Sequence, residues 1–321
     1  MTPAPLRDLL LGTVPETTAL ALGLLTLVLV GPGPLWVRRW PFLPRVPRAA
    51  VTLWQAGTVA SLVAVTLAGA VAVRAALAGD RPRGTLGAAL IALDTVIALF
   101  AVLVLARLAW SLVTVARRTR ARRARHRAAV DLLGQVDERA ALPGLRVVAG
   151  SFPLAYCLPS LRASRVVVSS ATLAALDADE LRAVLAHEEA HLRARHDVVL
   201  DTFTALHQAF PHLVRSEIPA EQCRLLVEML ADDAAVRRVG RLPLAHALVA
   251  LAGAPVPREA LAAGRHAVAE RVDRLGRPVT RRTRALAGAL YLLAVSLVAS
   301  GPLVLVVVPS MLRAVANMLS I

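Results

Sequence analysis

Four long apolar segments constrain the fold of this chain more than any other feature. A helix that crosses a bilayer needs about 20 mainly apolar residues. The clearest such segment covers residues 285–308 and contains no charged side chain. Three others lie at about 17–37, 50–78 and 86–115. Because 57% of the 321 residues are also hydrophobic, the sequence predicts an α-helical membrane protein with four transmembrane helices.

The first apolar segment has a second interpretation, as a cleaved signal peptide. A signal peptide needs a basic start and a small-residue cleavage site after its apolar run. Here Arg7 is followed directly by Asp8, and no such cleavage site follows the run. The sequence therefore favours a transmembrane helix, whose end is interrupted by the Gly-Pro-Gly-Pro stretch at residues 31–34.

The arginines predict how the chain is oriented in the membrane. All 37 basic residues are arginines, and the net charge is +15. Four arginines follow the first apolar segment, and seven lie within residues 117–127, after the third. Because positive loops stay in the cytosol, both regions are expected there. This predicts a membrane region at 1–116, a polybasic juxtamembrane segment at 117–127, a cytosolic domain at 128–283 and a short extracytoplasmic tail at 309–321.

The positive charge also bears on possible partners. Arginines that cluster beside apolar segments fit a bilayer with anionic headgroups. The alternative partner is nucleic acid, but no nucleic-acid recognition fold accompanies the basic run, so nucleic acid is not an expected partner. The sequence does not specify an oligomeric state.

The region between the third and fourth apolar segments is expected to form an α+β domain. Short runs rich in β-branched or apolar residues predict strands at 145–150, 155–159 and 165–170. Helices are expected at about 178–194, 198–214, 220–239, 244–251 and 267–275. Cys157 and Cys223 are the two cysteines of the chain, so no disulfide framework is expected.

One predicted helix of this domain contains the sequence His-Glu-Glu-Ala-His. Asp177 and Glu180 form a capping-box pattern at its start. His187 and His191 lie four residues apart and share one helical face, so both imidazoles can reach one ion. Glu188 is offset from them, where it can take a proton from water held by that ion. The pattern indicates a catalytic zinc site; the alternative is a surface helix with two solvated histidines.

A catalytic zinc site needs a third protein ligand. His196 does not fit the elongated three-histidine motif, which requires a histidine where Asp197 stands. Downstream, Glu228 and Asp232 lie four residues apart within a largely apolar stretch. Because a buried carboxylate without a partner is costly, Glu228 is predicted to be the third ligand, with an exposed helical acid as the alternative. Asp232 is predicted to accept a hydrogen bond from the outer nitrogen of a ligating histidine.

These motifs resemble those of a known group of enzymes. The stretch from "VVVSSATLAALDADELRAVLAHEEAHLRARHD" to "EMLADDAA" is similar to the membrane zinc metallopeptidases of the beta-lactam-sensor (BlaR/MecR-like) type, and to the related HtpX and CAAX prenyl proteases, all gluzincins. Four spans with the protease domain inserted before the last one match the sensor layout. The resemblance implies an inserted α+β gluzincin-like zinc metalloprotease domain. In that domain His187, His191 and Glu228 bind Zn²⁺, Glu188 is the base, and Asp232 supports a ligand.

The resemblance also suggests substrates and further site residues. It implies cleavage of a protein or peptide, with a cytosolic transcriptional repressor or membrane proteins under quality control as the candidates. The segment "RHAVAERVDRL" is similar to "HP…R(I/V)xxL" of the HtpX and CAAX proteases and places His266 as a transition-state hydrogen-bond donor. Ala267 replaces the proline of that pattern, and a solvated histidine at a helix start is the alternative.

Two further expectations follow from the same comparison. The strand around Cys157 occupies the place of an edge strand that holds extended substrate. Cys157 is either a small buried residue or a ligand that blocks zinc in a latent form. The sensors carry a penicillin-binding domain after the last span, where this sequence has about a dozen residues, so direct beta-lactam sensing is not expected. A non-catalytic metal-binding receptor or scaffold is the alternative from another class.

Overall fold

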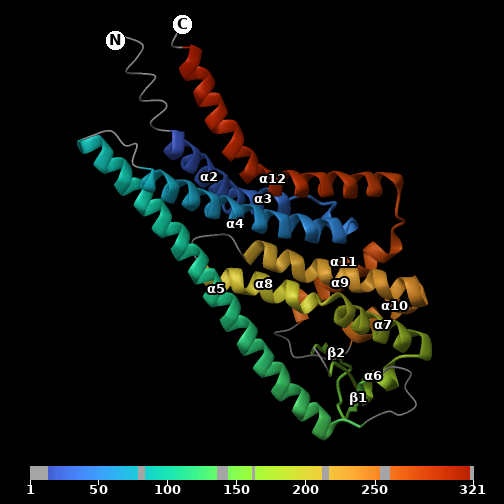
Figure 1. Cartoon of the computed structure of the whole chain (residues 1–321). Coiled ribbons are helices and arrows are strands. Elements are labelled where there is room, and N and C mark those ends of the chain that lie inside the picture. Colours follow the sequence, from blue (N-terminus) through green and yellow to red (C-terminus); the bar gives the residue numbers. More distant parts are fainter. Residues whose placement is uncertain are drawn as a thin grey trace.

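The computed structural model describes residues 14–78, 84–135, 144–160, 163–211, 217–253 and 261–318, with no side-chain description for 261–266. Long helices lie beside a smaller domain of helices and one sheet (Figure 1). The long apolar elements are α2 (Val14–Val30) with α3 (Pro32–Arg38), α4 (Pro47–Leu77), α5 (Thr85–Leu133) and α12 (Arg281–Met318). The domain contains β1 (Leu145–Val148), β2 (Ala155–Leu158), β3 (Arg165–Ser169), α6 (Ser170–Ala175), α7 (Ala178–Ala194), α8 (His196–Ala209), α9 (Glu217–Val239), α10 (Arg241–Ala252) and α11 (Leu261–Gly276).

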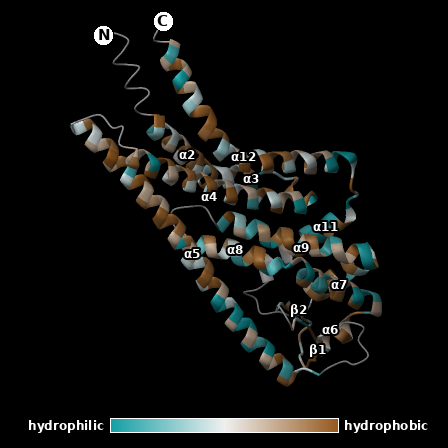
Figure 2. Ribbon diagram, viewed as in Figure 1, coloured by the Kyte–Doolittle hydropathy of each residue, from teal (hydrophilic) through white to brown (hydrophobic). Residues whose placement is uncertain are grey.

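Four helical segments of the described chain are long and apolar enough to cross a membrane, which is compatible with a membrane protein. Their outward faces are largely hydrophobic (Figure 2). The helix α4 packs against α2, α5 and α12. Small buried residues on α4 permit this close packing. At Gly69, for example, an added Cβ would lie 2.6 Å from the Cβ of Ala101 on α5, so only glycine fits there.

The helix α5 joins the membrane region to the domain. Its 49 residues form one continuous helix about 74 Å long, more than twice the thickness of the hydrocarbon core. It therefore includes the arginine-rich segment 117–127 and runs past α8 toward the sheet (Figure 1). The hydroxyl of Ser111 donates to the carbonyl of Ala205 on α8 (2.7 Å), and Arg123 pairs with Asp197 and Asp201 (3.1 Å each). Part of the basic segment thus contacts the domain.

The sheet has three strands in the order β1-β3-β2. The central strand β3 runs parallel to β1 and antiparallel to β2. Its Val166, Val167 and Val168 are buried, as expected for a β-branched run between two neighbours. The helix α6 follows at once and is capped by the Ser169 side chain, an element that the sequence analysis did not predict. The strand β2 forms one edge of this sheet.

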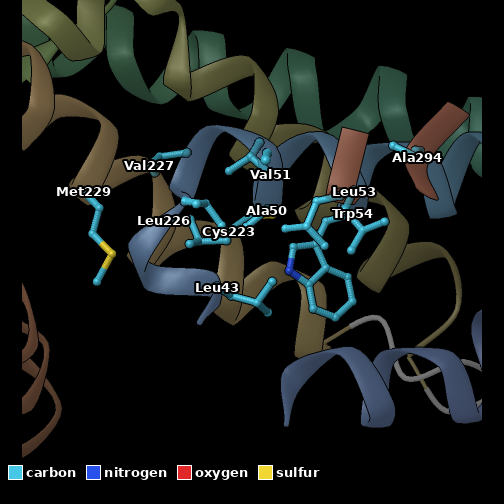
Figure 3. Close-up of a cluster of buried hydrophobic side chains, with 14 of the residues drawn as sticks. Leu43, Ala50, Val51, Leu53, Trp54, Cys223, Leu226, Val227, Met229 and Ala294 are labelled. Carbon is cyan, nitrogen blue, oxygen red and sulfur yellow. The ribbon is translucent and has the colours of Figure 1, made fainter. Parts of the chain in front are cut away.

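The largest hydrophobic cluster fuses the domain to the membrane region. Side chains from α9 pack on the first turns of α4, as Figure 3 shows for Leu226 and Cys223 beside Ala50. Phe203 of α8 belongs to the same cluster and is 2% exposed. The predicted helix at 198–214 is shorter than expected, because α8 ends at Ala209. The shared core means that α9 cannot move far without disturbing α4.

Candidate metal centre

The helix α7 begins and ends at defined signals. The Asp177 carboxylate accepts hydrogen bonds from the amides of Asp179 and Glu180 (2.8 Å each), and the Glu180 side chain accepts one from the Asp177 amide (3.0 Å). The predicted capping box is therefore confirmed. At the other end, Arg195 adopts the left-handed conformation (φ 51°) and starts α8 directly. The chain turns there from α7 into α8, and Nδ1 of His196 comes to lie beside Nδ1 of His191.

The structure brings together the two motif histidines and the acid from α9. The Nε2 atoms of His187 and His191 lie 3.1 Å apart. Glu228 places one carboxylate oxygen 3.3 Å from Nε2 of His187 and the other 3.4 Å from Nε2 of His191. These ligand atoms all lie within 4.8 Å of one another. Three potential donors from two helices thus converge on one point.

The donor set fits a catalytic zinc ion. Two imidazoles and one carboxylate are a common protein ligand set at such sites, and a fourth position remains for water. The exposure of the side chains matches this arrangement: His187 is 9% exposed and His191 14%, whereas Glu228 is 38% exposed. The histidines are fixed from inside the domain, and the site opens to solvent beside Glu228.

The electrostatics of the metal-free cluster are set by contacts between its acids and its histidines. Burial alone would raise the pKa of Glu228, but its contacts with His187 and the charge of Arg271 outweigh it and lower the pKa to about 2. Burial would lower the pKa of His187, yet Asp232 and Glu228 raise it to about 9. Burial lowers the pKa of His191 to about 4. Without metal at neutral pH, the cluster therefore holds ionised carboxylates and a proton on His187.

The outer nitrogens of both histidines also have partners. Nδ1 of His187 lies 3.0 Å from a carboxylate oxygen of Asp232, which is fully buried. Nδ1 of His191 lies 3.0 Å from Nδ1 of His196, which is 6% exposed. The sequence analysis set His196 aside as a ligand. The structure instead places it behind a ligand candidate, a position that motif spacing could not reveal.

Arg271 of α11 is a second residue of the site that sequence reasoning missed. Its Nε and Nη2 donate to the two carboxylate oxygens of Asp232 (2.8 and 2.6 Å), and its Nη1 lies 3.2 Å from Glu228. The signal was present in the segment similar to "HP…R(I/V)xxL", where attention went to the histidine. His266 falls within α11, but its side chain lies outside the described part of the chain.

Glu188 and Cys157 lie beside the cluster. Burial raises the pKa of Glu188, which suits a group that must accept a proton. Burial, followed by the charges of Glu188 and Glu228, also raises the pKa of the Cys157 thiol. Among the described residues, Cys157 is not part of the group that could hold a metal, so the geometry favours the small-residue interpretation.

Two histidines four apart on one helix, facing a carboxylate from a second helix, define the centre of a metallopeptidase. The chain belongs to peptidase family M48, whose model matches residues 134–304, more than half of the chain. It is therefore a metallopeptidase of a family that typically uses zinc. No curated protein and no solved structure matches the chain. The finer resemblance to the beta-lactam sensors and to the HtpX and CAAX proteases stays a prediction.

Proposed function

We propose that the protein is a membrane-anchored, zinc-dependent endopeptidase in which His187, His191 and Glu228 bind the metal. The observation that carries the proposal is the convergence of both Nε2 atoms on the two oxygens of one carboxylate. Membership of the M48 family supports it independently. The arginine distribution supports a cytosolic position for the metal centre.

The remaining side chains supply the proton transfers and the positioning. Zinc bound in such a site polarises a peptide carbonyl and makes water more acidic. Glu188 accepts the proton of the water whose oxygen attacks the carbonyl carbon. As the C–N bond breaks, Glu188 passes that proton to the leaving amine nitrogen. Asp232 and His196 hold the outer nitrogens of the histidines, and Arg271 fixes Asp232.

The edge strand β2 is the element best suited to bind substrate. It lies at one end of the sheet order and packs against α7. An extended peptide can add to such an edge through main-chain hydrogen bonds. We infer that a cytosolic transcriptional repressor is the substrate in a signalling role. Cleavage of membrane proteins in quality control is the second candidate, because α9 packs directly on α4 and keeps the site near the membrane region.

The test uses the full chain reconstituted in liposomes, with metal analysis and cleavage of a quenched fluorescent casein. Wild type should bind one zinc per chain and cleave. Glu228→Gln should lose the metal, whereas Glu221→Gln, an exposed acid on the same helix, should behave as wild type. Zinc retained by Glu228→Gln at wild-type affinity would refute the ligand assignment. Cleavage is also followed in cells by mass spectrometry. If wild type binds zinc but cleaves nothing in liposomes or in cells, the result would favour the non-catalytic receptor.

A further inference from the structure

A cavity of about 530 Å³ lies behind the metal centre, where α4 and α12 begin. It is bounded by the η1 turn (Leu43–Arg45), the start of α4, α9 and the first turns of α12. On α9, Arg237 and Leu230 line it, and these lie roughly opposite Glu228 on the helix, given about 100° per residue. The cavity is therefore distinct from the metal centre, although both use the same helix.

The lining is strongly basic. Four arginines contribute to it: Arg45, Arg48, Arg237 and Arg284. Within the described ranges, none of these four guanidinium groups forms an ion pair with a carboxylate. The lining also contains the acid Asp233, but Arg274 already neutralises it through two bonds of 2.6 and 2.7 Å. All four arginines are exposed, and together they form a positively charged lining that favours an anion.

The position of the cavity indicates which kind of anion. The helices α4 and α12 are both long and apolar enough to span a bilayer, and the cavity lies at the ends where they begin. Its lining also includes apolar or aromatic surface from Val46, Ala287 and Tyr291. The exposed apolar face of α12 continues from there through Leu292 and Val295. A ligand with a phosphate head and an apolar tail would match the basic cavity and the apolar surface that adjoins it.

We propose that this arginine cavity binds the headgroup of an anionic phospholipid from the cytosolic leaflet. The guanidinium groups hold the phosphate, and an acyl chain lies along α12. The proposal rests on the membrane placement proposed above but not on peptidase activity. Bound lipid would join α4, α9 and α12, and so fix the helix that carries Glu228 relative to the bilayer.

The experiment measures lipid retained by the full chain. Wild type is reconstituted in nanodiscs of equal phosphatidylglycerol and phosphatidylcholine, and native mass spectrometry then counts bound lipids. We expect one retained phosphatidylglycerol. A variant with Arg45, Arg48 and Arg284 changed to glutamine should lose this preference roughly one hundredfold. The control replaces Arg182, Arg193 and Arg224 of the domain with glutamine; it removes the same charge from equally exposed positions that do not line the cavity, and it should keep the lipid.

Each other outcome overturns the proposal. Equal retention by the two triple variants, or no preference in wild type, would mean that the cavity is not a lipid site. Displacement of the lipid by millimolar inorganic phosphate would indicate a site for a free anion instead. If the cavity variant does not fold, the single change Arg48→Gln replaces it. This change should weaken the preference for phosphatidylglycerol several-fold, and an unchanged preference would contradict the proposal. Casein cleavage in the same nanodiscs reports separately on the peptidase.

Discussion

The metal centre contains two sets of side chains that differ in position and in how the sequence specifies them. The inner set faces the point where the metal would be held and comprises His187, His191 and Glu228. The outer set lies behind it and comprises Asp232, His196 and Arg271. Only Glu228 of the inner set is substantially exposed (38%); His187 is as buried as the outer set, whose members are at most 9% exposed.

This difference indicates that the buried outer side chains fix the geometry of the site. Buried, fully hydrogen-bonded polar groups interact strongly because little water screens them. The inner imidazoles can rotate about their side-chain bonds, so their orientation depends on the partners behind them. We therefore expect the inner set to determine whether chemistry occurs and the outer set to determine how tightly the metal is held.

The largest effect is expected from Glu188→Gln, which removes the proton acceptor and leaves both sets intact. Casein cleavage should fall by about 10²–10⁴-fold, the usual contribution of a general base. Bound zinc, measured by elemental analysis, should stay at the wild-type level. Loss of zinc in this variant would contradict the separation between chemistry and metal binding.

The next effect tests the outer set through Arg271→Met. This change leaves Asp232 buried without its bidentate partner, which should lower the free energy of unfolding by about 3 kcal/mol. Zinc affinity should fall by about 10–100-fold, with kcat per bound zinc little changed. Arg277→Met is the control, because that arginine is about half exposed and pairs only with Asp273 one turn away. Equal effects of the two changes on zinc affinity would show that Arg271 does not support the metal centre.

The inner set was predictable from the sequence because its pattern is local. Asp177 and Glu180 mark the start of α7, and the predicted helix at 178–194 matches its bounds. His187 and His191 then follow at one-turn spacing, which fixes their common face. Predicting Glu228 required a second motif, Glu228 with Asp232, but that motif also lies within one helix, α9.

The outer set and the arginine cavity were not predictable because they depend on packing between distant segments. His196 contacts His191 where Arg195 takes a left-handed conformation and the chain turns from α7 into α8. Arg271 meets Asp232 across 39 residues of sequence. The continuity of α5 through residues 117–127 was also hard to foresee, although arginine and alanine are both good helix formers.

The pH dependence of zinc binding follows from the inner set. In the metal-free site the pKa of His187 is raised to about 9, so at pH 7 a proton must leave before its Nε2 can bind metal. Affinity should therefore rise about tenfold per pH unit up to pH 9 and then level off. His191, with a pKa lowered to about 4, adds no competing proton above pH 5. Calorimetry in two buffers should detect about one proton released at pH 7; none released would contradict the assignment.

A smaller effect is expected from His196→Ala, which removes the partner of the outer nitrogen of His191. Zinc affinity should fall by about tenfold, at the low end for such partners. His196→Asn should restore most of it, because an amide oxygen can accept the same hydrogen bond. A purely structural role predicts instead that both variants unfold alike and bind zinc alike, which thermal unfolding and zinc titration distinguish.

The smallest effect concerns the start of α7, far from either set. Asp177→Ala removes the capping box and should lower the free energy of unfolding by about 1 kcal/mol. Because the cap lies almost three turns before His187, we expect zinc affinity and kcat to change less than twofold. Asp177→Asn, which preserves a capping oxygen, is the matched control and should lose only a few tenths of a kcal/mol. A larger loss of zinc in Asp177→Ala than in Arg271→Met would reverse the comparison, because local helix stability would then matter more than the buried partners.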